Sequence, residues 1–187
     1  MPSKKQSTTS RKNKRLENEP SFLVDRSLGR FKLLSQLRAA GIDVTPGDDV
    51  YDQDERDPWI FYSSGKSGKI VLTADRDFMK SFPHMAAIAL GKTTVIAFTS
   101  NNYNSEARGR AFIKAKSRVF RAIRDNEANF IGSVGMDSTF LILERSPAPN
   151  RKYCDERDWN SYERVCKAEG IDPASRAPFQ ESRSASD

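Results

Sequence analysis

Two short apolar segments of this chain each end in an aspartate. The first, SFLVD, runs from Ser21 to Asp25, and the second, KIVLTAD, runs from Lys69 to Asp75. An apolar run that ends in a carboxylate is typical of a buried strand whose last residue reaches solvent. Because ligands gather at the carboxyl ends of parallel strands, we expect both aspartates at one edge of such a sheet.

A third aspartate stands where a helix is expected to begin. Asp57 precedes Pro58 and Trp59, and proline is favoured in the first turn of a helix. Carboxylates that converge repel one another, which raises a pKa or requires a bound cation. Oxygen ligands select Mg²⁺ or Mn²⁺, and Mg²⁺ also binds substrate phosphate oxygens. The pattern therefore predicts a catalytic metal site for phosphodiester chemistry, with Asp25, Asp57 and Asp75 as its carboxylates.

A plainer interpretation is open for each of these acids, because aspartate is common at helix caps and solvated strand ends. The repetition of one pattern favours a functional role for these acids, since VDRSLG and LTADRDF both place an acid directly after an apolar run. The helix-borne acid also has competitors. Asp54 and Glu55 lie shortly before Asp57 in the chain and could take its role.

The elements that must position these acids alternate along the chain. Their apolar patterns predict strands over 21–25, 42–45, 69–75 and 93–99, and helices over 27–41, 57–62 and 105–126. Two further runs, 130–134 and 139–143, are separated by a turn and predict an added strand pair. Strands that alternate with helices imply right-handed crossovers. The expected fold class is α/β, a three-layer α/β/α sandwich with a mainly parallel central sheet.

Two of the predicted helices carry further sequence signals, which concern the ends of the first and the charge of the last. The first is expected to start from an N-cap at Ser27 and to end in a left-handed turn at Gly41. Its apolar face is formed by residues spaced three apart, namely Leu28, Phe31, Leu34 and Leu37. The helix over 105–126 carries many basic residues, Arg108 and Lys114 among them, which could guide a phosphate backbone.

The composition indicates a soluble protein with an anionic partner. The formal net charge is +6, and no run approaches the roughly 18 apolar residues that span a bilayer. Lys and Arg side chains that neutralise phosphates release counterions, so nucleic acid is the simplest partner and a membrane is not expected. Cys154 and Cys166 have no further cysteine or nearby histidine for a zinc site, and we expect ordinary thiols.

The chain divides into three expected parts. Residues 1–20 are basic and lack the apolar core of a secretory signal, which predicts a disordered cytoplasmic tail. Residues 21–145 hold the alternating elements and form the predicted domain. Residues 146–187 form a tail of mixed charge, in which one short helix is expected around Trp159 to Cys166.

Five segments of the chain, taken in order, resemble the PIN-like nucleases, especially the branch related to the VapC-type toxins of toxin and antitoxin pairs. They are FLVDRSLG, LRAAGIDV, DPWI, LTADRDF and FTSNN, within residues 22–102. The resemblance implies that Asp25 and Asp75 are metal ligands and that Asp57 is the helix-borne acid. It adds Asp77 as a fourth ligand. It also implies a PIN-like α/β/α sandwich, single-stranded RNA as substrate and an antitoxin protein as partner.

The chain departs from the family pattern after the segment TTVIAFT, where related nucleases can carry another acid. Thr99 and Ser100 stand there, and they are weak metal ligands that could hydrogen-bond a water or a phosphate. The fourth acid is therefore the open position of the predicted site. The residues expected to bind substrate are Arg26, Thr99, Ser100, Arg108 and Lys114.

The same residues bear on other possible functions. A receiver-like signalling domain accepts phosphate on an aspartate, but it usually has an acidic pair where this chain has Asp25 and Arg26. A PIN-like RNA-binding protein with a degraded site would fit the missing fourth acid.

The GKS sequence at Gly65 lacks the earlier glycine of a nucleotide-binding P-loop. His84, the single histidine, has no evident acid partner in the sequence and is expected to be structural or to lie on the surface.

Overall fold

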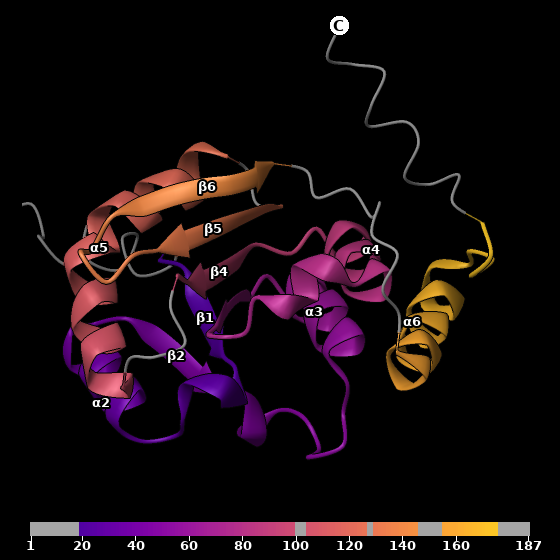
Figure 1. Ribbon diagram of the computed structural model, residues 1–187, viewed down its shortest axis with the longest axis horizontal. Helices are drawn as coiled ribbons and strands as arrows, with labels where there is room; N and C mark the ends of the chain where they lie inside the picture. The colour runs from indigo at the N-terminus through magenta and orange to yellow at the C-terminus, as the bar shows by residue number, and fades with distance from the viewer. Residues whose placement is uncertain (1–18, 100–103, 127–128, 146–154, 176–187) are drawn as a thin grey trace, which may run out of the picture.

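A six-stranded sheet forms the middle of the protein. The computed structural model describes residues 19–99, 104–126, 129–145 and 155–175. The strands are β1 (Ser21–Val24), β2 (Asp43–Pro46), β3 (Ile70–Thr73), β4 (Val95–Phe98), β5 (Phe130–Val134) and β6 (Phe140–Arg145). Their order is β2-β1-β3-β4-β5-β6, parallel throughout except for the antiparallel pair β5 and β6 (Figure 1). The predicted strands and the added strand pair are confirmed.

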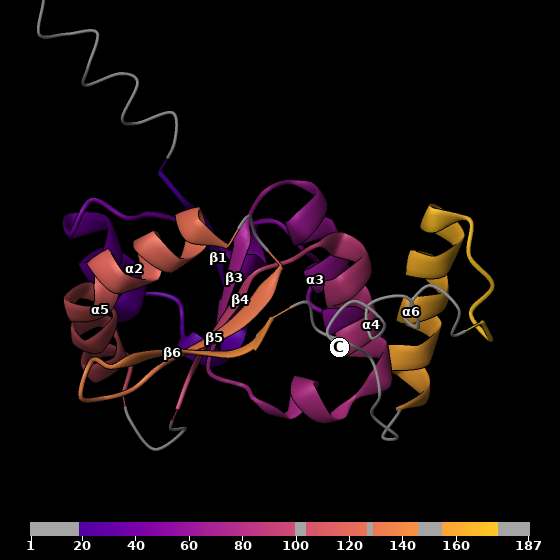
Figure 2. The same cartoon turned by 90° about the horizontal axis from the view of Figure 1, so that it is seen from above.

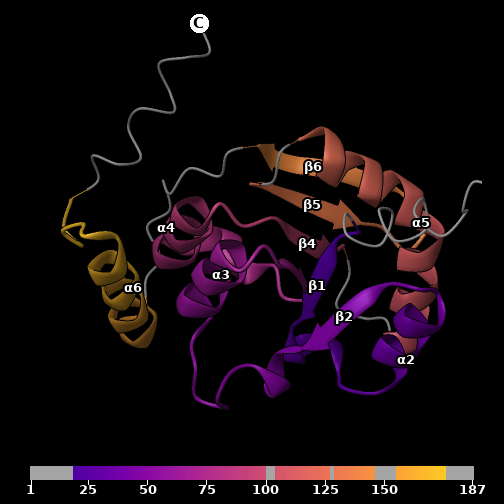
Figure 3. The same cartoon turned by 180° about the vertical axis from the view of Figure 1, so that it is seen from behind.

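Helices cover both faces of this sheet. They are α2 (Lys32–Ala39), α3 (Asp57–Lys66), α4 (Phe82–Gly91), α5 (Ser105–Asp125) and α6 (Glu156–Glu169). Seen from above, α2 and α5 lie on one side of the sheet, and α3 and α4 lie on the other with α6 outside them (Figure 2). The view from behind shows the same two layers (Figure 3). The predicted three-layer α/β/α sandwich is therefore confirmed.

Strand β1 shows how the sequence builds this arrangement. Successive strand residues point to opposite faces, so an apolar run can fill two cores at once. Phe22 and Val24 are buried in the core under α2 and α5, whereas Leu23 is buried in the core under α3, α4 and α6. A sheet whose strands are apolar on both faces requires a helical layer on each side, and this chain provides both layers.

The first helix starts later than its apolar spacing predicts. Residues Arg26–Leu28 form a single 3₁₀ turn, and α2 begins only at Lys32, so the prediction of an N-cap at Ser27 is wrong. Phe31 is also not on the buried face, because 78% of its surface is exposed. The hydroxyl of Ser27 bonds Asp25 instead of capping a helix. The left-handed turn at Gly41 is confirmed by its φ of 68°.

Helix α3 runs one turn beyond the predicted end, and its last turn crosses α4 closely. A Cβ atom built on Gly65 would lie 2.2 Å from the carbonyl oxygen of Gly91. The GKS sequence is therefore a helix end at a tight helix crossing. Helix α4 itself was not among the predicted helices, because its apolar residues surround the whole helix. Pro83 fits there because it occupies the first turn.

The C-terminal helix packs on the core. The short helix predicted around Trp159 to Cys166 is present, and it extends over Glu156–Glu169. Its residues Tyr162, Val165 and Cys166 are fully buried against α3 and α4. The tail expected over 1–20 lies outside the described residues except for Glu19 and Pro20. Ser100 and residues 146–154 and 176–187, Cys154 among them, also lie outside the described residues. No helix among the described residues is long and apolar enough to cross a membrane.

Candidate active site

The predicted acids meet where the strand order changes direction. From β1 the chain goes to β2 on one side and then to β3 on the other, and such switch points form the crevices in which α/β proteins bind ligands. Asp25 follows β1 directly, and Asp75 lies two residues after β3. Together with Asp57, the first residue of α3, they line one pocket. We call these three residues the acid triad.

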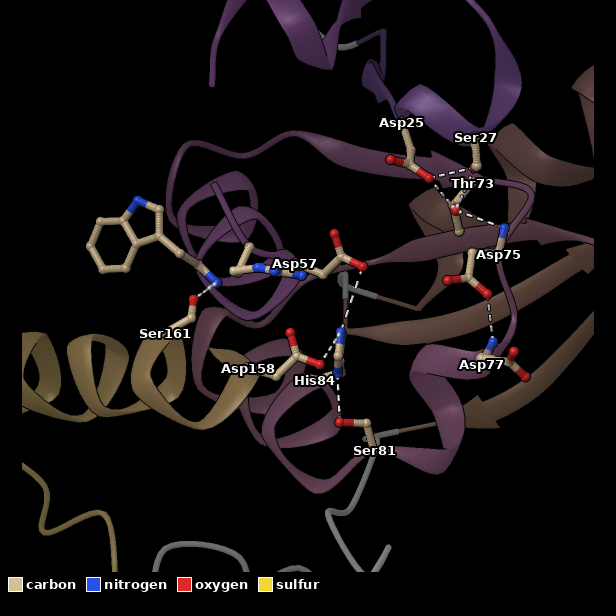
Figure 4. A network of polar contacts seen from close by, with 12 residues as sticks. Asp25, Ser27, Asp57, Thr73, Asp75, Asp77, Ser81, His84, Asp158 and Ser161 are labelled. Atoms are coloured by element: carbon tan, nitrogen blue, oxygen red, sulfur yellow. Dashed lines mark hydrogen bonds and ion pairs between the residues drawn. The ribbon is translucent and has the colours of Figure 1, made fainter. Parts of the chain in front are cut away.

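Two hydroxyl groups hold the carboxylate of Asp25 (Figure 4). The hydroxyls of Ser27 and Thr73 both donate to Asp25 Oδ2, with a distance of 2.7 Å for Thr73. Each hydroxyl also accepts a backbone N–H, Ser27 from Ala74 and Thr73 from Asp75, both at 3.0 Å. The second oxygen of Asp25 lies on the side of the carboxylate away from these two hydroxyls. Ser27 and Thr73 thus fix one oxygen of Asp25.

The surroundings of Asp25 favour its protonated form. Burial raises the pKa of Asp25, and the nearby negative charge of Asp57 raises it further. The hydrogen bonds from Ser27 and Thr73 oppose this rise. A divalent cation between the carboxylates would relieve both unfavourable effects, because it supplies positive charge beside them.

The raised pKa of Asp25 predicts how the stability of the metal-free protein depends on pH. A carboxyl whose pKa is higher in the folded state binds more protons there, so its contribution to stability is present at low pH and is lost as pH rises through the folded pKa. The Asp25→Asn variant has no ionisable carboxyl at this position, so it does not lose stability in this way as the pH rises. The quantity of interest is the unfolding free energy of Asp25→Asn minus that of the wild type. We expect this difference to increase as the pH rises above about 4, the ordinary aspartate pKa.

Urea denaturation in chelator over a series of pH values measures this difference. The exposed Asp43, which begins β2 at the opposite edge of the sheet, offers the control variant Asp43→Asn. A difference between Asp25→Asn and wild type that is the same at every pH would contradict the prediction.

The second acid, Asp57, lies beside a buried histidine. His84 is only 6% exposed, and its Nε2 is 3.5 Å from Asp57 Oδ2 and 3.8 Å from Asp158 Oδ2. Its Nδ1 is 2.6 Å from the hydroxyl oxygen of Ser81. The expectation that His84 has no acid partner is therefore wrong, because the fold supplies two carboxylates that are far away in sequence.

Asp158 was missed by the sequence analysis. It lies in the first turn of α6, and burial raises its pKa, an effect that the nearby His84 opposes. The apolar spacing of α6 indicates a helix that needs a partner surface. It does not indicate which surface, so no pattern in the chain points to Asp158.

Asp77, the predicted fourth ligand, points away from the acid triad (Figure 4). Its carboxylate pairs with Lys80 at 2.6 Å, and its side chain is 79% exposed. Its backbone N–H donates to Asp75 Oδ1 at 2.8 Å. Asp77 therefore contributes to the site by orienting Asp75, while its own carboxylate stays outside the group of three.

The residues expected to bind substrate fall in different places. Arg26 pairs with Asp48 at 2.8 Å and donates to backbone carbonyls of the following loop, so it holds that loop in position. Arg108 is buried, which lowers its pKa, and it does not lie on the surface where it was expected. Lys114 and Thr99 are exposed, and Ser100 lies outside the described residues.

A larger cleft adjoins the acid triad. Its volume is about 550 Å³, and it shares Asp57 and Asp75 with the pocket. Three arginines, Arg26, Arg56 and Arg157, border the cleft together with six acids. Arg56 and Arg157 were not among the residues expected to bind substrate, because nothing in their spacing distinguishes them from other arginines of the chain. Arginines beside a carboxylate group suit a polyanion that must approach it.

The donor set of the site fits a hard divalent cation. Within the described ranges, no three His, Cys, Asp or Glu side chains stand close enough together to enclose a metal ion on their own. Mg²⁺ does not need such an enclosure, because it keeps several waters and is bound through one or two carboxylates together with substrate phosphates. Asp25 and Asp75, with one oxygen each held by hydrogen bonds, are suited to that kind of binding.

When the chain was compared with protein-family models, with curated proteins and with solved structures, none of them matched it. What the protein does is therefore inferred from its own side chains and their geometry.

Proposed function

We propose that the protein is a metal-dependent endoribonuclease that hydrolyses phosphodiester bonds in single-stranded RNA with Mg²⁺ or Mn²⁺. The observation that carries the proposal is the pocket at the switch point of the sheet, which is lined by Asp25, Asp57 and Asp75. Three acids from separate elements line this space, and burial together with the negative charge of Asp57 raises the pKa of Asp25.

The chemistry divides between the ion and the chain. A divalent ion held by Asp25, Asp57 and Asp75 would supply a water of lowered pKa and positive charge beside the phosphate. The chain holds the ligands in place before the substrate arrives. Ser27 and Thr73 fix Asp25, and the backbone of Asp77 fixes Asp75. Ligands that are already oriented need no reorganisation during the reaction.

The surroundings of the triad support a nucleic acid substrate. Arg56 and Arg157 border the cleft that adjoins the triad, and guanidinium groups bind the phosphates of a nucleic acid well. The net charge of +6 adds a general attraction for polyanions. The resemblance to VapC-type toxins extends the proposal to an antitoxin partner.

Incubation of the purified protein with a mixed pool of single-stranded RNA tests the proposal. We expect cleavage with Mg²⁺ and with Mn²⁺, none in chelator, and recovery when Mn²⁺ is restored in excess. Cutting that continues in chelator would refute metal dependence. Binding of RNA without cutting in either metal would instead indicate an RNA-binding protein with a degraded site.

One observation favours a second candidate, a receiver-like phosphoacceptor domain. The parallel strand order β2-β1-β3-β4-β5 is the flavodoxin-like order, which receiver domains share. In such a domain an aspartate at a strand end would accept phosphate, and the exposed Thr99 after β4 would respond to it. Treatment with acetyl phosphate followed by intact mass measurement separates the two candidates. A stable gain of one phosphoryl group that Asp75→Asn abolishes would favour the receiver.

A further inference from the structure

His84 stands at the point where three helices begin. Asp57 is the first residue of α3, His84 is in the first turn of α4, and Asp158 is in the first turn of α6. The N-terminus of a helix carries partial positive charge, which stabilises nearby carboxylates. Two acids from different helices can therefore face the same imidazole (Figure 4).

The contacts of His84 define which atom faces the acids. Ser81 precedes α4, and its hydroxyl can donate to Nδ1 at 2.6 Å. In that arrangement the ring hydrogen is on Nε2, which is the atom that faces Asp57 and Asp158. The ring is also held by Phe61, whose centroid is 5.9 Å away in an edge-on arrangement. The donor is thus oriented by its own helix and by α3.

Helix α6 is fastened to α3 along its length. The backbone N–H of Trp59 donates to the Ser161 hydroxyl at 3.1 Å, and the Tyr62 hydroxyl donates to Glu169 at 2.6 Å. The guanidinium of Arg164 lies 3.7 Å from the centroid of the Trp59 ring. These contacts fix the position of α6 relative to the start of α3, and they thereby hold Asp158 beside His84.

We propose that His84 is a positioning residue that orients the Asp57 carboxylate, and that Asp158 completes this bridge, which makes α6 part of the active site. The inference rests on the proposed function, because the role of Asp57 in binding the cation gives the bridge its purpose. His84 and Asp158 act through Asp57 and do not themselves touch the reacting atoms. We call the three residues Asp57, His84 and Asp158 the helix bridge.

The first test is Mn²⁺ binding by isothermal titration, without RNA. His84→Leu removes the donor and keeps an apolar side chain of similar size, whereas His84→Gln keeps an N–H donor near the place of Nε2. Partners of metal ligands typically contribute about 10-fold to 100-fold to metal affinity. We expect His84→Leu to weaken Mn²⁺ binding about 10-fold, and His84→Gln to retain most of the affinity.

A double variant tests whether the bridge acts as a unit. Asp158→Ala should also weaken Mn²⁺ binding, and the combination with His84→Leu should cost no more than the worse single change, because residues in one network are not additive. Asp43→Asn is the control for loss of a distant carboxylate. Asp158→Ala also serves as the second variant if His84→Leu does not fold. Equal losses in His84→Leu and His84→Gln, or losses that add, would overturn the bridge.

A second measurement separates the bridge from the ribonuclease proposal. Hydrogen exchange of the metal-free protein should be faster in the first turns of α3 and α6 in His84→Leu than in His84→Gln. If the wild type neither binds Mn²⁺ nor cuts RNA but this pattern is present, the ribonuclease proposal fails and the bridge stands. If exchange in both helices is unchanged in His84→Leu, the bridge is refuted whatever the protein cuts.

Discussion

The Asp75→Asn variant is expected to fold like the wild type and to cut RNA about a thousandfold more slowly. The amide has the shape of the carboxylate, and its oxygen can still accept the backbone N–H of Asp77. It lacks the charge that binds a divalent cation, and loss of several kcal/mol of metal stabilisation corresponds to roughly this factor in rate. Single-turnover cleavage of one labelled RNA, with protein in excess, measures the chemical step directly.

Asp77→Asn is the matched control for this experiment. It makes the same chemical change two residues away, on a carboxylate that is 79% exposed and paired with Lys80. We expect its cleavage rate to stay within a few-fold of the wild type, since exposed ion pairs contribute little. Equal losses in both variants would place Asp77 among the metal ligands, as the family resemblance implies. A wild-type rate in Asp75→Asn would refute the nuclease site.

The largest stability effect is expected at the crossing of α3 and α4. In Gly65→Ala the new Cβ would lie 2.2 Å from both the Gly91 carbonyl oxygen and Thr93 Oγ1. Neither neighbour can yield easily, because one belongs to the α4 backbone and the other donates to the Phe61 carbonyl at 2.7 Å. Overpacking of this kind costs about 3 kcal/mol, of which the better helix propensity of alanine offsets at most about 1 kcal/mol.

Urea denaturation of Gly65→Ala measures this loss as a lower midpoint with an unchanged slope. A suitable comparison is Asn160→Ala, at an exposed position of α6, which is expected to stay within about 0.5 kcal/mol of the wild type. Since α3 also carries Asp57, separation of the two helices should weaken Mn²⁺ binding as well. A variant as stable as the wild type would show that the crossing can open without cost.

Much of the fold could be predicted because local sequence patterns determine its strands and several of its helices. The runs that end at Asp25 and Asp75 are apolar on both faces, and such runs form buried parallel strands. Parallel strands bring their carboxyl ends to one edge, so two strand-end acids had to meet. The start of α3 at Asp57 followed from Pro58 in the same way.

Other parts of the fold have no local signal. The apolar residues of α4 cover its whole circumference, because the helix is buried between the sheet and α6, and a helix of that kind shows no period. Phe31 matches the spacing of a helix face, yet the chain must first turn after β1, which leaves this residue in solvent. Periodicity indicates which residues share a face and leaves open where the helix starts.

By itself, the sequence determined the layers of the protein and the acids that stand at the ends of its strands. Only the tertiary structure decided the neighbours of those acids. His84 and Asp57 are separated by 27 positions and Asp158 by a further 74, and their contacts arise because α3, α4 and α6 begin at one place. Strand and helix patterns extend over a few residues, whereas the packing of one helix start against another depends on the shapes of whole elements.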